Sequence, residues 1–201
     1  MDADRIRANL DRVRERIGME VEICAAIKYV ALEDLPALAD AGIRLVGENR
    51  AQEMLAKHEG HGDLFEWDFI GALQSRKVKD VAPIARLIHS VASESALKQL
   101  EKHPAREVLL EVNVAGEEDK AGIAPEELGA YIERCPVPVG GLMTMPPFAD
   151  DPEQSRPHFA RLAELADEHG LTRLSMGTTQ DYEVAAQEGA TIVRLGTVLY
   201  A

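Results

Sequence analysis

The chain has 201 residues and a net charge of −13, from 35 acidic against 22 basic residues. This acid excess argues against nucleic acids and anionic membranes as partners, since both attract basic patches. Hydrophobic residues make up 46% and charged residues 28%, which is typical of a globular protein, and no apolar run is long enough to span a bilayer.

An amphipathic helix is expected first, because Ile6, Leu10, Val13 and Ile17 recur at helical spacing and Gly18 follows as a C-cap. After it, short apolar stretches with strand character alternate with helical stretches to the last residue. Strands are predicted over residues 20–30, 43–46, 67–71, 87–91, 107–114, 137–143, 173–175 and 191–195. Helices are predicted over residues 32–41, up to about residue 58, over 74–81, from residue 93, and over 125–134, 153–168 and 181–188.

Eight strand-then-helix units in succession predict a (β/α)₈ barrel of the TIM type with an extra N-terminal helix. We expect residues 1–201 to form a single domain. The alternative is an open doubly wound sheet, but no glycine-rich dinucleotide fingerprint follows the first strand. In a barrel the loops that follow the strands share one rim, where active sites form. The functional residues are therefore expected in these loops.

Lys28 comes at the end of the first predicted strand, after the apolar run in EVEICAAIKYV. A lysine in this place can extend its charge to solvent. Alternatively, apolar surroundings can keep its amine uncharged and ready to form a Schiff base with a carbonyl compound. The adjacent Tyr29 points to the opposite face, where we expect it to pack in the barrel. The choice for Lys28 depends on whether other loops build a site around the same rim.

Two glycine-containing loops follow the last two predicted strands, SMGTT at residues 175–179 and RLGT at residues 194–197. Backbone N–H groups in such loops bind anions, and barrels commonly bind phosphate after strands seven and eight. Tight turns and a salt bridge from Arg194 would explain either loop alone, whereas the two together favour a phosphate site. A lysine amine near a phosphate site suggests pyridoxal 5′-phosphate, which carries an aldehyde and a phosphate.

The chain resembles the pyridoxal phosphate homeostasis proteins, a family of single-domain barrels, also called YggS- or PROSC-like, that is related to the N-terminal barrel of alanine racemase. The resemblance runs nearly from end to end. It is carried by six blocks in order: AAIKYV, GENRAQE, WDFIGALQSRKVK, LLEVNVAGEEDKAGI, GLMTM and LSMGTTQDYEVAAQEGATIVRLGTVLY.

The resemblance implies that Lys28 holds pyridoxal phosphate as a Schiff base and that Asn49 lies near the pyridine ring and its 3′-oxygen. It also implies that Arg194 faces the pyridine nitrogen, as in alanine racemases. The phosphate would be held by Gly177, Thr179, Gly196 and Thr197.

This chain departs from the family pattern at two places. The family often has IGHLQSNK where this chain has Ala72 and Arg76, so the roles of these two residues at the rim stay open. It often has GMS where this chain has GTT at residues 177–179, and Thr179 keeps the hydroxyl. Lys120 could also reach the rim, although exposure to solvent is the simpler expectation.

Arg194 argues against efficient catalysis. A guanidinium stays protonated, so it cannot accept a proton from a pyridinium nitrogen, and a neutral ring is a poor electron sink. The resemblance implies that alanine racemases add a second domain with a tyrosine base, for which we expect no room in 201 residues. The leading hypothesis is a protein of intracellular pyridoxal phosphate (vitamin B6) homeostasis without robust turnover. The alternatives are a pyridoxal phosphate-dependent amino-acid racemase or lyase, and a class I aldolase-type barrel that uses Lys28.

The expected cofactor is pyridoxal 5′-phosphate, and apo-enzymes that depend on it are candidate recipients. We expect a cytoplasmic protein, because Cys24 and Cys135 lie in apolar contexts typical of reduced thiols and the N-terminus lacks the apolar core of a secretion signal. A monomer is expected, with no nucleic-acid partner, no membrane partner and no metal site.

Overall fold

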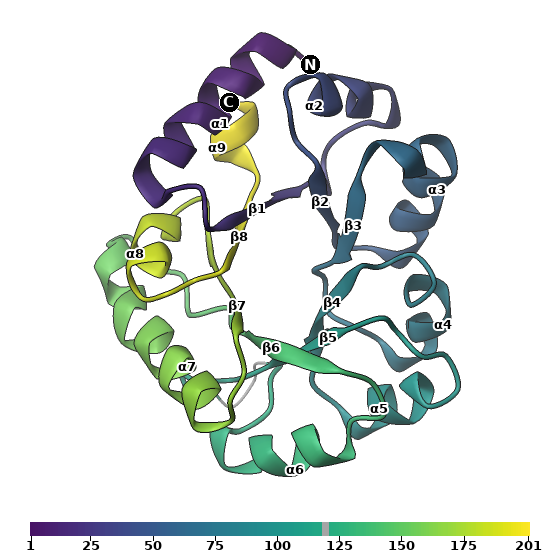
Figure 1. The fold of residues 1–201 in the computed structure, drawn as a ribbon, viewed down its shortest axis with the longest axis vertical. Helices are drawn as coiled ribbons and strands as arrows, with labels where there is room; N and C mark the ends of the chain where they lie inside the picture. Colours follow the sequence, from purple (N-terminus) through teal and green to yellow (C-terminus); the bar gives the residue numbers. More distant parts are fainter. Residues whose placement is uncertain (118–120) are drawn as a thin grey trace.

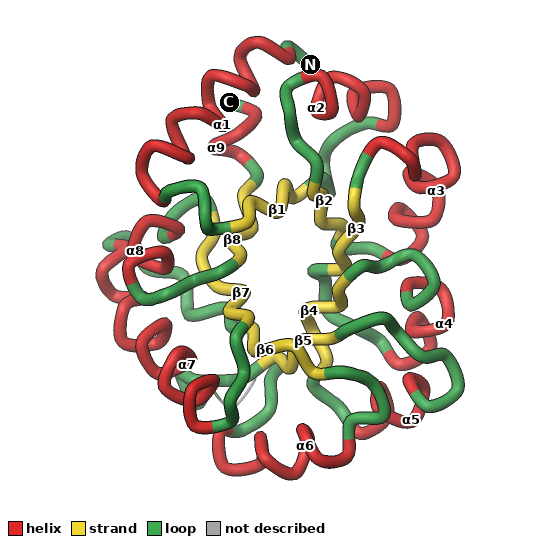
Figure 2. Tube along the Cα trace, in the orientation of Figure 1, coloured by secondary structure: helices red, strands yellow, loops and turns green. Residues whose placement is uncertain are grey.

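The computed structural model describes residues 1–117 and 121–201 and shows a ring of strands surrounded by helices (Figures 1 and 2). Within these residues, eight parallel strands pair in sequence order as a closed barrel. The last strand closes the barrel by pairing with the first, with Cys24 opposite Arg194. The predicted (β/α)₈ barrel with an additional N-terminal helix is confirmed.

The strands and helices follow one another in the predicted order. The strands are β1 (Glu22–Ala26), β2 (Leu45–Glu48), β3 (Glu66–Phe69), β4 (Leu87–Val91), β5 (Val108–Glu111), β6 (Val139–Met143), β7 (Arg173–Thr178) and β8 (Ile192–Leu195). The helices are α1 (Ala3–Ile17), α2 (Leu35–Asp40), α3 (Ala51–His61), α4 (Val78–Val81), α5 (Glu94–Leu100), α6 (Leu128–Arg134), α7 (Arg156–Glu168), α8 (Tyr182–Gln187) and α9 (Thr197–Tyr200).

Several element boundaries differ from the prediction. The first strand was predicted over residues 20–30, but β1 covers only Glu22–Ala26, because the chain turns at residues 28 and 29 while Ile27 and Val30 stay buried. An apolar run in a sequence indicates buried residues, and here the buried residues continue beyond the end of the strand. The helix predicted over 74–81 is a 3₁₀ turn (Ser75–Lys77) followed by α4, and the short helix α9 was not predicted.

The N-terminal helix α1 braces the end of the chain. The side chain of Asp2 caps it by accepting from the backbone N–H groups of Asp4 and Arg5, and Gly18 ends it with a left-handed φ of 81°. Asn9 is buried and donates through Nδ2 to the carbonyl oxygens of Leu199 (3.0 Å) and Ala201 (3.1 Å). The two termini therefore lie side by side at one edge of the barrel (Figure 1).

The apolar core has two parts. The larger lies between the strands and the helices. The smaller takes side chains from strands alone and lies inside the barrel, because successive residues of a strand face opposite sides. Its members are Cys24, Leu45, Leu87, Leu109, Met143 and Ile192.

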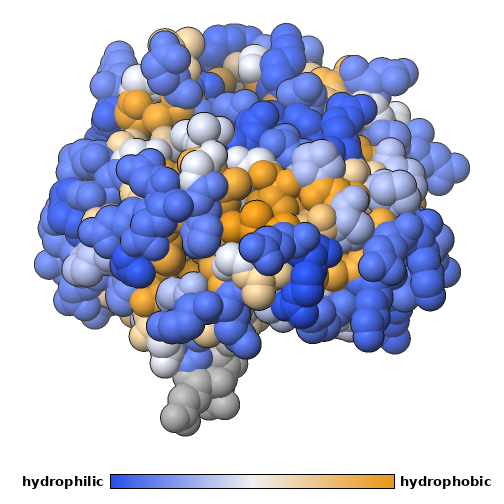
Figure 3. Space-filling model, turned by 60° about the horizontal axis from the view of Figure 1, so that its bottom comes forward, coloured by the Kyte–Doolittle hydropathy of each residue, from blue (hydrophilic) through white to orange (hydrophobic). Residues whose placement is uncertain are grey.

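Figure 3 shows a face of the molecule that is mostly hydrophilic, with apolar side chains near its centre. Among the described residues, no helix has both the length and the apolar character needed to cross a membrane.

Gly141 on β6 leaves no room for a side chain against the neighbouring strand. A Cβ at this position would lie 1.9 Å from the backbone oxygen of Arg173 on the neighbouring strand β7. We expect Gly141→Ala to lower the free energy of unfolding by about 1–3 kcal/mol, as overpacking does. Urea unfolding followed by circular dichroism measures this change.

Gly60 provides the control, because it lies within α3 and a Cβ there would come no closer than 3.6 Å to Leu32. Gly60→Ala should raise the free energy of unfolding by about 0.5–1 kcal/mol through helix propensity. Equal effects of the two substitutions would contradict the close strand approach.

Candidate functional site

A cavity of about 600 Å³ opens at the mouth of the barrel where the strands have their carboxyl ends. Side chains and turns that follow β1, β2, β3, β6, β7 and β8 line it, as expected for this fold. The structure brings together in this cavity most of the site residues expected from the sequence, namely Lys28, Asn49, Thr179, Arg194, Gly196 and Thr197.

Gly177 does not line this cavity. It lies at an adjoining hollow of about 100 Å³, together with Thr178 and Gln180. Its φ of 89° is left-handed, and a Cβ there would lie 2.5 Å from the Cβ of Ala185 in α8. Glycine at this position therefore lets α8 pack against β7, and a contact of Gly177 with phosphate stays a prediction.

Two backbone N–H groups converge at the edge of the cavity. The hydroxyl oxygen Oγ1 of Thr179 accepts from the N–H groups of Gly196 (3.3 Å) and Val198 (3.5 Å). We call the Gly196 and Val198 N–H groups the amide pair. Two donors directed at one oxygen form the start of an anion site. Sequence reasoning missed Val198 because a backbone N–H group leaves no signature in the side chain.

Lys28 lies on an exposed turn beyond the end of β1, and its side chain lines the cavity. The N–H of Val30 donates to the carbonyl oxygen of Ile27 (3.0 Å), and this turn lifts Lys28 away from the strand wall. Its Nζ lies 4.6 Å from the ring centroid of Tyr29, a cation–π contact. Of the two alternatives for Lys28, the structure shows exposure to solvent. The expected packing of Tyr29 in the barrel is wrong, because Tyr29 is 85% exposed.

A buried ion pair fixes the backbone beside Lys28. Lys57 in α3 donates through Nζ to Oε2 of Glu48 (2.7 Å) and to the carbonyl oxygen of Ile27 (2.8 Å). The other carboxylate oxygen of Glu48 accepts from the N–H of Asn49 (2.6 Å). The pair thus joins the carboxyl ends of β1 and β2, the two strands that Lys28 and Asn49 follow. Sequence reasoning missed it, although a lysine on the buried side of an amphipathic helix was a readable signal.

Arg194 is 6% exposed and is held by four hydrogen bonds. Its Nη1 donates to the backbone oxygen (2.8 Å) and Oγ (2.6 Å) of Ser175. Its Nη2 donates to the backbone oxygen of Thr144 (3.0 Å) and to Sδ of Met145 (3.0 Å). Burial lowers the pKa of Arg194, but arginine keeps its proton in proteins. These bonds use the terminal N–H groups and leave the Nε–H without a bond to the described residues.

Ser175 connects Arg194 to a buried histidine. Nδ1 of His89 lies 2.8 Å from the Ser175 hydroxyl, and Nε2 lies 3.0 Å from Oδ2 of Asp68. Burial lowers the pKa of His89 against the attraction of Asp68, so the ring is neutral at pH 7. An ionised carboxylate only accepts, so Nε2 carries the proton. The Ser175 hydroxyl then donates to Nδ1 and accepts from Arg194.

The same chain of contacts continues to the opposite mouth of the barrel. Arg86 donates to both oxygens of Asp68 (2.9 and 2.8 Å) and to both oxygens of Glu22 (3.2 and 2.9 Å). Burial alone would raise the pKa of Asp68, but the hydrogen bonds from Arg86 and His89 outweigh burial and lower it. We call the residues Arg194, Ser175, His89, Asp68, Arg86 and Glu22 the polar chain. It crosses the barrel interior.

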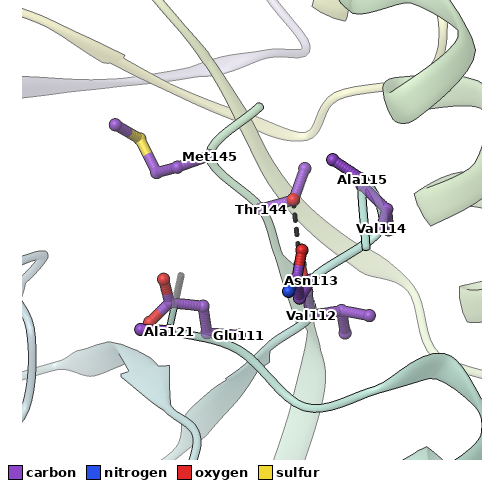
Figure 4. Close-up of a pocket in the computed structure, with 8 residues that line it drawn as sticks. All are labelled: Glu111, Val112, Asn113, Val114, Ala115, Ala121, Thr144 and Met145. Carbon is purple, nitrogen blue, oxygen red and sulfur yellow. Dashed lines mark hydrogen bonds between the residues drawn. The ribbon is translucent and has the colours of Figure 1, made fainter. Parts of the chain in front are cut away.

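Glu111 ends β5 and lines the main cavity on the side of β5 and β6. It also lines a second cavity of about 210 Å³, together with Thr144 and Met145 (Figure 4). Thr144 closes the inner side of this cavity by donating to the backbone oxygen of Val112 (2.9 Å). Burial raises the pKa of Glu111, and the charge of Arg194 opposes this rise. Sequence reasoning did not single out Glu111, which reads as one polar residue in a strand.

The structure shows where two of the rim residues with open roles, Ala72 and Arg76, lie relative to the main cavity. Ala72 lines the main cavity, whereas Arg76 donates to Gln74 (3.1 Å) outside it. Lys120 lies outside the described residues. Within residues 1–117 and 121–201, no three histidine, cysteine, aspartate or glutamate side chains are grouped as a metal site would require.

Comparisons with known proteins identify the family of this chain. The family model of the alanine racemase N-terminal domain matches residues 1–201. The chain is 43% identical to a pyridoxal phosphate homeostasis protein of Aquifex aeolicus, over 98% of this chain and 94% of that protein. A pyridoxal phosphate homeostasis protein of Vibrio cholerae is 33% identical, over 98% of this chain and 93% of that protein. The structure of PipY from Synechococcus elongatus with pyridoxal phosphate bound is similar at a TM-score of 0.86, with 30% identity, 98% of this chain and all of that chain covered.

The buried pair of Lys57 and Glu48 can be tested by removing the cation. Lys57→Met leaves the Glu48 carboxylate buried without its charged partner, so we expect a loss of about 3–5 kcal/mol in the free energy of unfolding. The double variant Glu48→Gln with Lys57→Met removes both charges and should recover a large part of this loss. Urea titrations of the three proteins measure it, and an additive double variant would contradict the pairing.

The neutral state of His89 predicts a pH dependence of stability. The lowered pKa means that the unfolded chain binds more protons than the folded chain below the ordinary histidine value of about 6.5. The free energy of unfolding should therefore fall as the pH is lowered from 7.5 towards 5, with a slope of at most about 1.4 kcal/mol per unit.

His89→Gln removes the titrating group and keeps a donor and an acceptor, so its slope over this range should be smaller. Urea unfolding at each pH measures both proteins. Identical slopes would show that His89 does not carry the effect.

Proposed function

The chain belongs to the alanine racemase N-terminal domain family, in which its relatives are pyridoxal phosphate homeostasis proteins, and we propose that it binds pyridoxal 5′-phosphate at the carboxyl-end mouth of the barrel. In this proposal it serves intracellular pyridoxal phosphate homeostasis, with the cofactor held as a Schiff base on Lys28 and without robust turnover. One observation carries the proposal: Lys28 lines the same cavity as Thr179 and Gly196, which belong to the contact between the amide pair and the Thr179 hydroxyl.

The phosphate end of the cofactor fits the amide pair. The Gly196 and Val198 N–H groups already point to one oxygen atom, the Thr179 hydroxyl, which stands where a phosphate oxygen would accept. The hydroxyl of Thr197 lies at the same edge of the cavity. Neutral donors of this kind bind a phosphate without the burial of a further charge.

The aldehyde end fits Lys28, whose side chain lines the cavity. Pyridoxal phosphate, when bound, supplies an aldehyde that condenses with amines and a ring that can withdraw electrons. Lys28 provides the amine, and the ion pair of Lys57 and Glu48 holds the turn from which Lys28 extends.

The ring of the cofactor has two candidate partners. The side-chain oxygen Oδ1 of Asn49 is buried and has no donor among the described residues, which is unfavourable unless a ligand supplies one. The ring hydroxyl of pyridoxal phosphate is such a donor. Arg194 can direct its remaining Nε–H at the ring nitrogen, because its terminal nitrogens are bonded to Ser175, Thr144 and Met145.

Arg194 is also the reason to propose a carrier rather than an enzyme. A guanidinium donates to the ring nitrogen but takes no proton from it, so the nitrogen stays unprotonated and the ring withdraws electrons weakly. Binding and release are then favoured over transformation of a bound amine. Cytoplasmic location, a monomeric state and delivery to apo-enzymes belong to the same proposal, and free Cys24 and Cys135 are in keeping with a reducing compartment.

The decisive experiment traps the link to Lys28. The purified protein loaded with pyridoxal phosphate should be yellow, and borohydride should give a stable adduct on the peptide that contains Lys28. Lys28→Ala should lose this adduct while weak binding through the amide pair persists. Lys77→Ala is the matched control, because Lys77 lies outside the cavity and pairs with Asp80 at 3.6 Å, and it should keep the adduct.

An adduct on another lysine would move the site, and no adduct would refute the Schiff base. The absence of turnover is tested with a panel of L-amino acids. Racemisation or decarboxylation near the enzyme median of about 10 s⁻¹ would favour an enzyme over a carrier.

A further inference from the structure

Glu111 places a carboxyl group at the main cavity, and no residue within 1–117 and 121–201 donates a hydrogen bond to it. It faces the barrel interior, because Leu109, two residues earlier on β5, belongs to the interior cluster. Burial raises the pKa of Glu111 and the charge of Arg194 lowers it, and no hydrogen bond from the described residues contributes. A partly buried carboxyl group without a donor is unfavourable unless a ligand provides one.

Pyridoxal phosphate does not provide that donor. In the proposed binding mode its phosphate lies at the amide pair, its aldehyde carbon at Lys28, its ring nitrogen at Arg194 and its ring hydroxyl at Asn49. Each polar group of the cofactor is then matched, and the negative charge of Glu111 repels the phosphate. The counterpart of Glu111 is therefore a second molecule that carries a positive charge.

The second cavity, of about 210 Å³, shows what else this molecule carries. It shares Glu111 and Met145 with the main cavity, so the two spaces adjoin at these side chains. Figure 4 shows Glu111 and Met145 extending to the same open side of β5 and β6. Apart from Glu111, Asn113 and Thr144, the described lining is apolar, with Val112, Val114, Ala115, Ala121 and Met145.

We propose that this second cavity binds a small primary amine with an apolar substituent, and that Glu111 binds its ammonium group and takes up its proton as the amine removes the cofactor from Lys28. The inference rests on the proposed function. It deepens that function by giving the chemical class of the molecule that releases the cofactor.

The step balances in protons and bonds. The ammonium group gives one proton to Glu111, and the freed amine nitrogen forms a C–N bond to the carbon that Lys28 holds. The two protons that remain on the incoming nitrogen pass to Nζ of Lys28, the C–N bond to Nζ breaks as the incoming nitrogen forms a double bond to the same carbon, and Nζ leaves as an amine that takes the third proton back from Glu111. No oxidant or reductant is needed. The raised pKa of Glu111 makes its carboxylate a stronger base, which favours the first proton transfer.

The test compares wild-type protein with Glu111→Gln, each fully loaded with pyridoxal phosphate. After rapid mixing with n-propylamine, samples are quenched with borohydride at successive times, and the loss of the reduced adduct on the Lys28 peptide is followed. We expect Glu111→Gln to slow this loss by about tenfold or more, in the range of general base catalysis. Glu126→Gln is the control, because it makes the same change of charge on an exposed residue outside both cavities, and it should match wild type.

Glu111→Asp keeps a carboxylate one methylene shorter and should react faster than Glu111→Gln. This second variant also serves if the glutamine variant does not fold. Equal rates in wild type, Glu111→Gln and Glu111→Asp would overturn the inference.

A binding measurement without cofactor separates this inference from the proposed function. Propylammonium binding to the cofactor-free protein, followed by ligand-observed NMR, should weaken about tenfold in Glu111→Gln, as for the loss of a hydrogen bond to a charged group. Unchanged binding would overturn the inference. If wild-type protein gives no borohydride adduct on Lys28, the proposed function fails, and the NMR comparison still decides whether Glu111 binds an ammonium group.

Discussion

The positive charge of Arg194 lies inside the barrel, and the interior is organised around the need to stabilise it. A buried guanidinium is costly unless its N–H groups find acceptors. Two backbone oxygens, a hydroxyl and a sulfur atom provide them, from the residues directly after β6 and from Ser175 within β7. The Ser175 hydroxyl can accept from Arg194 because it donates to a neutral His89. Whether each group in the polar chain donates or accepts a hydrogen bond thus depends on the ionisation state of its neighbour.

The polar chain also explains why the interior of this barrel is only partly apolar. Asp68, His89 and Ser175 are almost fully buried, and each has its hydrogen bonds within the chain. Asp68 is ionised, Ser175 and His89 are neutral, and the polar chain ends with the charged pair of Arg86 and Glu22, near solvent at the amino-end mouth. A network in which every member is satisfied holds side chains in one arrangement. The orientation of Arg194 at the cofactor cavity is therefore set by contacts deep in the barrel.

The sequence predicted the barrel well because alternating strand and helix patterns depend on local burial, which single residues report. It predicted Lys28, Asn49, Thr179, Arg194, Gly196 and Thr197 at one mouth because strand order fixes which loops meet. It did not predict the pair of Lys57 and Glu48, the polar chain or Glu111. These contacts depend on which side chains of distant strands face each other across the barrel. Hydrophobic periodicity shows which residues are buried, but it does not show which residues of other strands they meet. The exposure of Tyr29 was missed for a related reason, since an apolar run does not show where the strand ends.

The two ends of the candidate site are built differently, and this difference bears on function. Arg194 lies on β8 and makes four hydrogen bonds, and the amide pair lies directly after β8, at the start of α9, where each N–H donates one hydrogen bond to Thr179. Lys28 lies on an exposed turn whose backbone is fixed but whose side chain contacts the face of the exposed Tyr29. Preorganised donors favour recognition of the phosphate and ring, because little order is lost on binding. In the proposed binding mode Lys28 holds the cofactor covalently, and its exposure would leave this link open to solvent and to other amines. Such a division suits a protein that binds its cofactor specifically and can still release it.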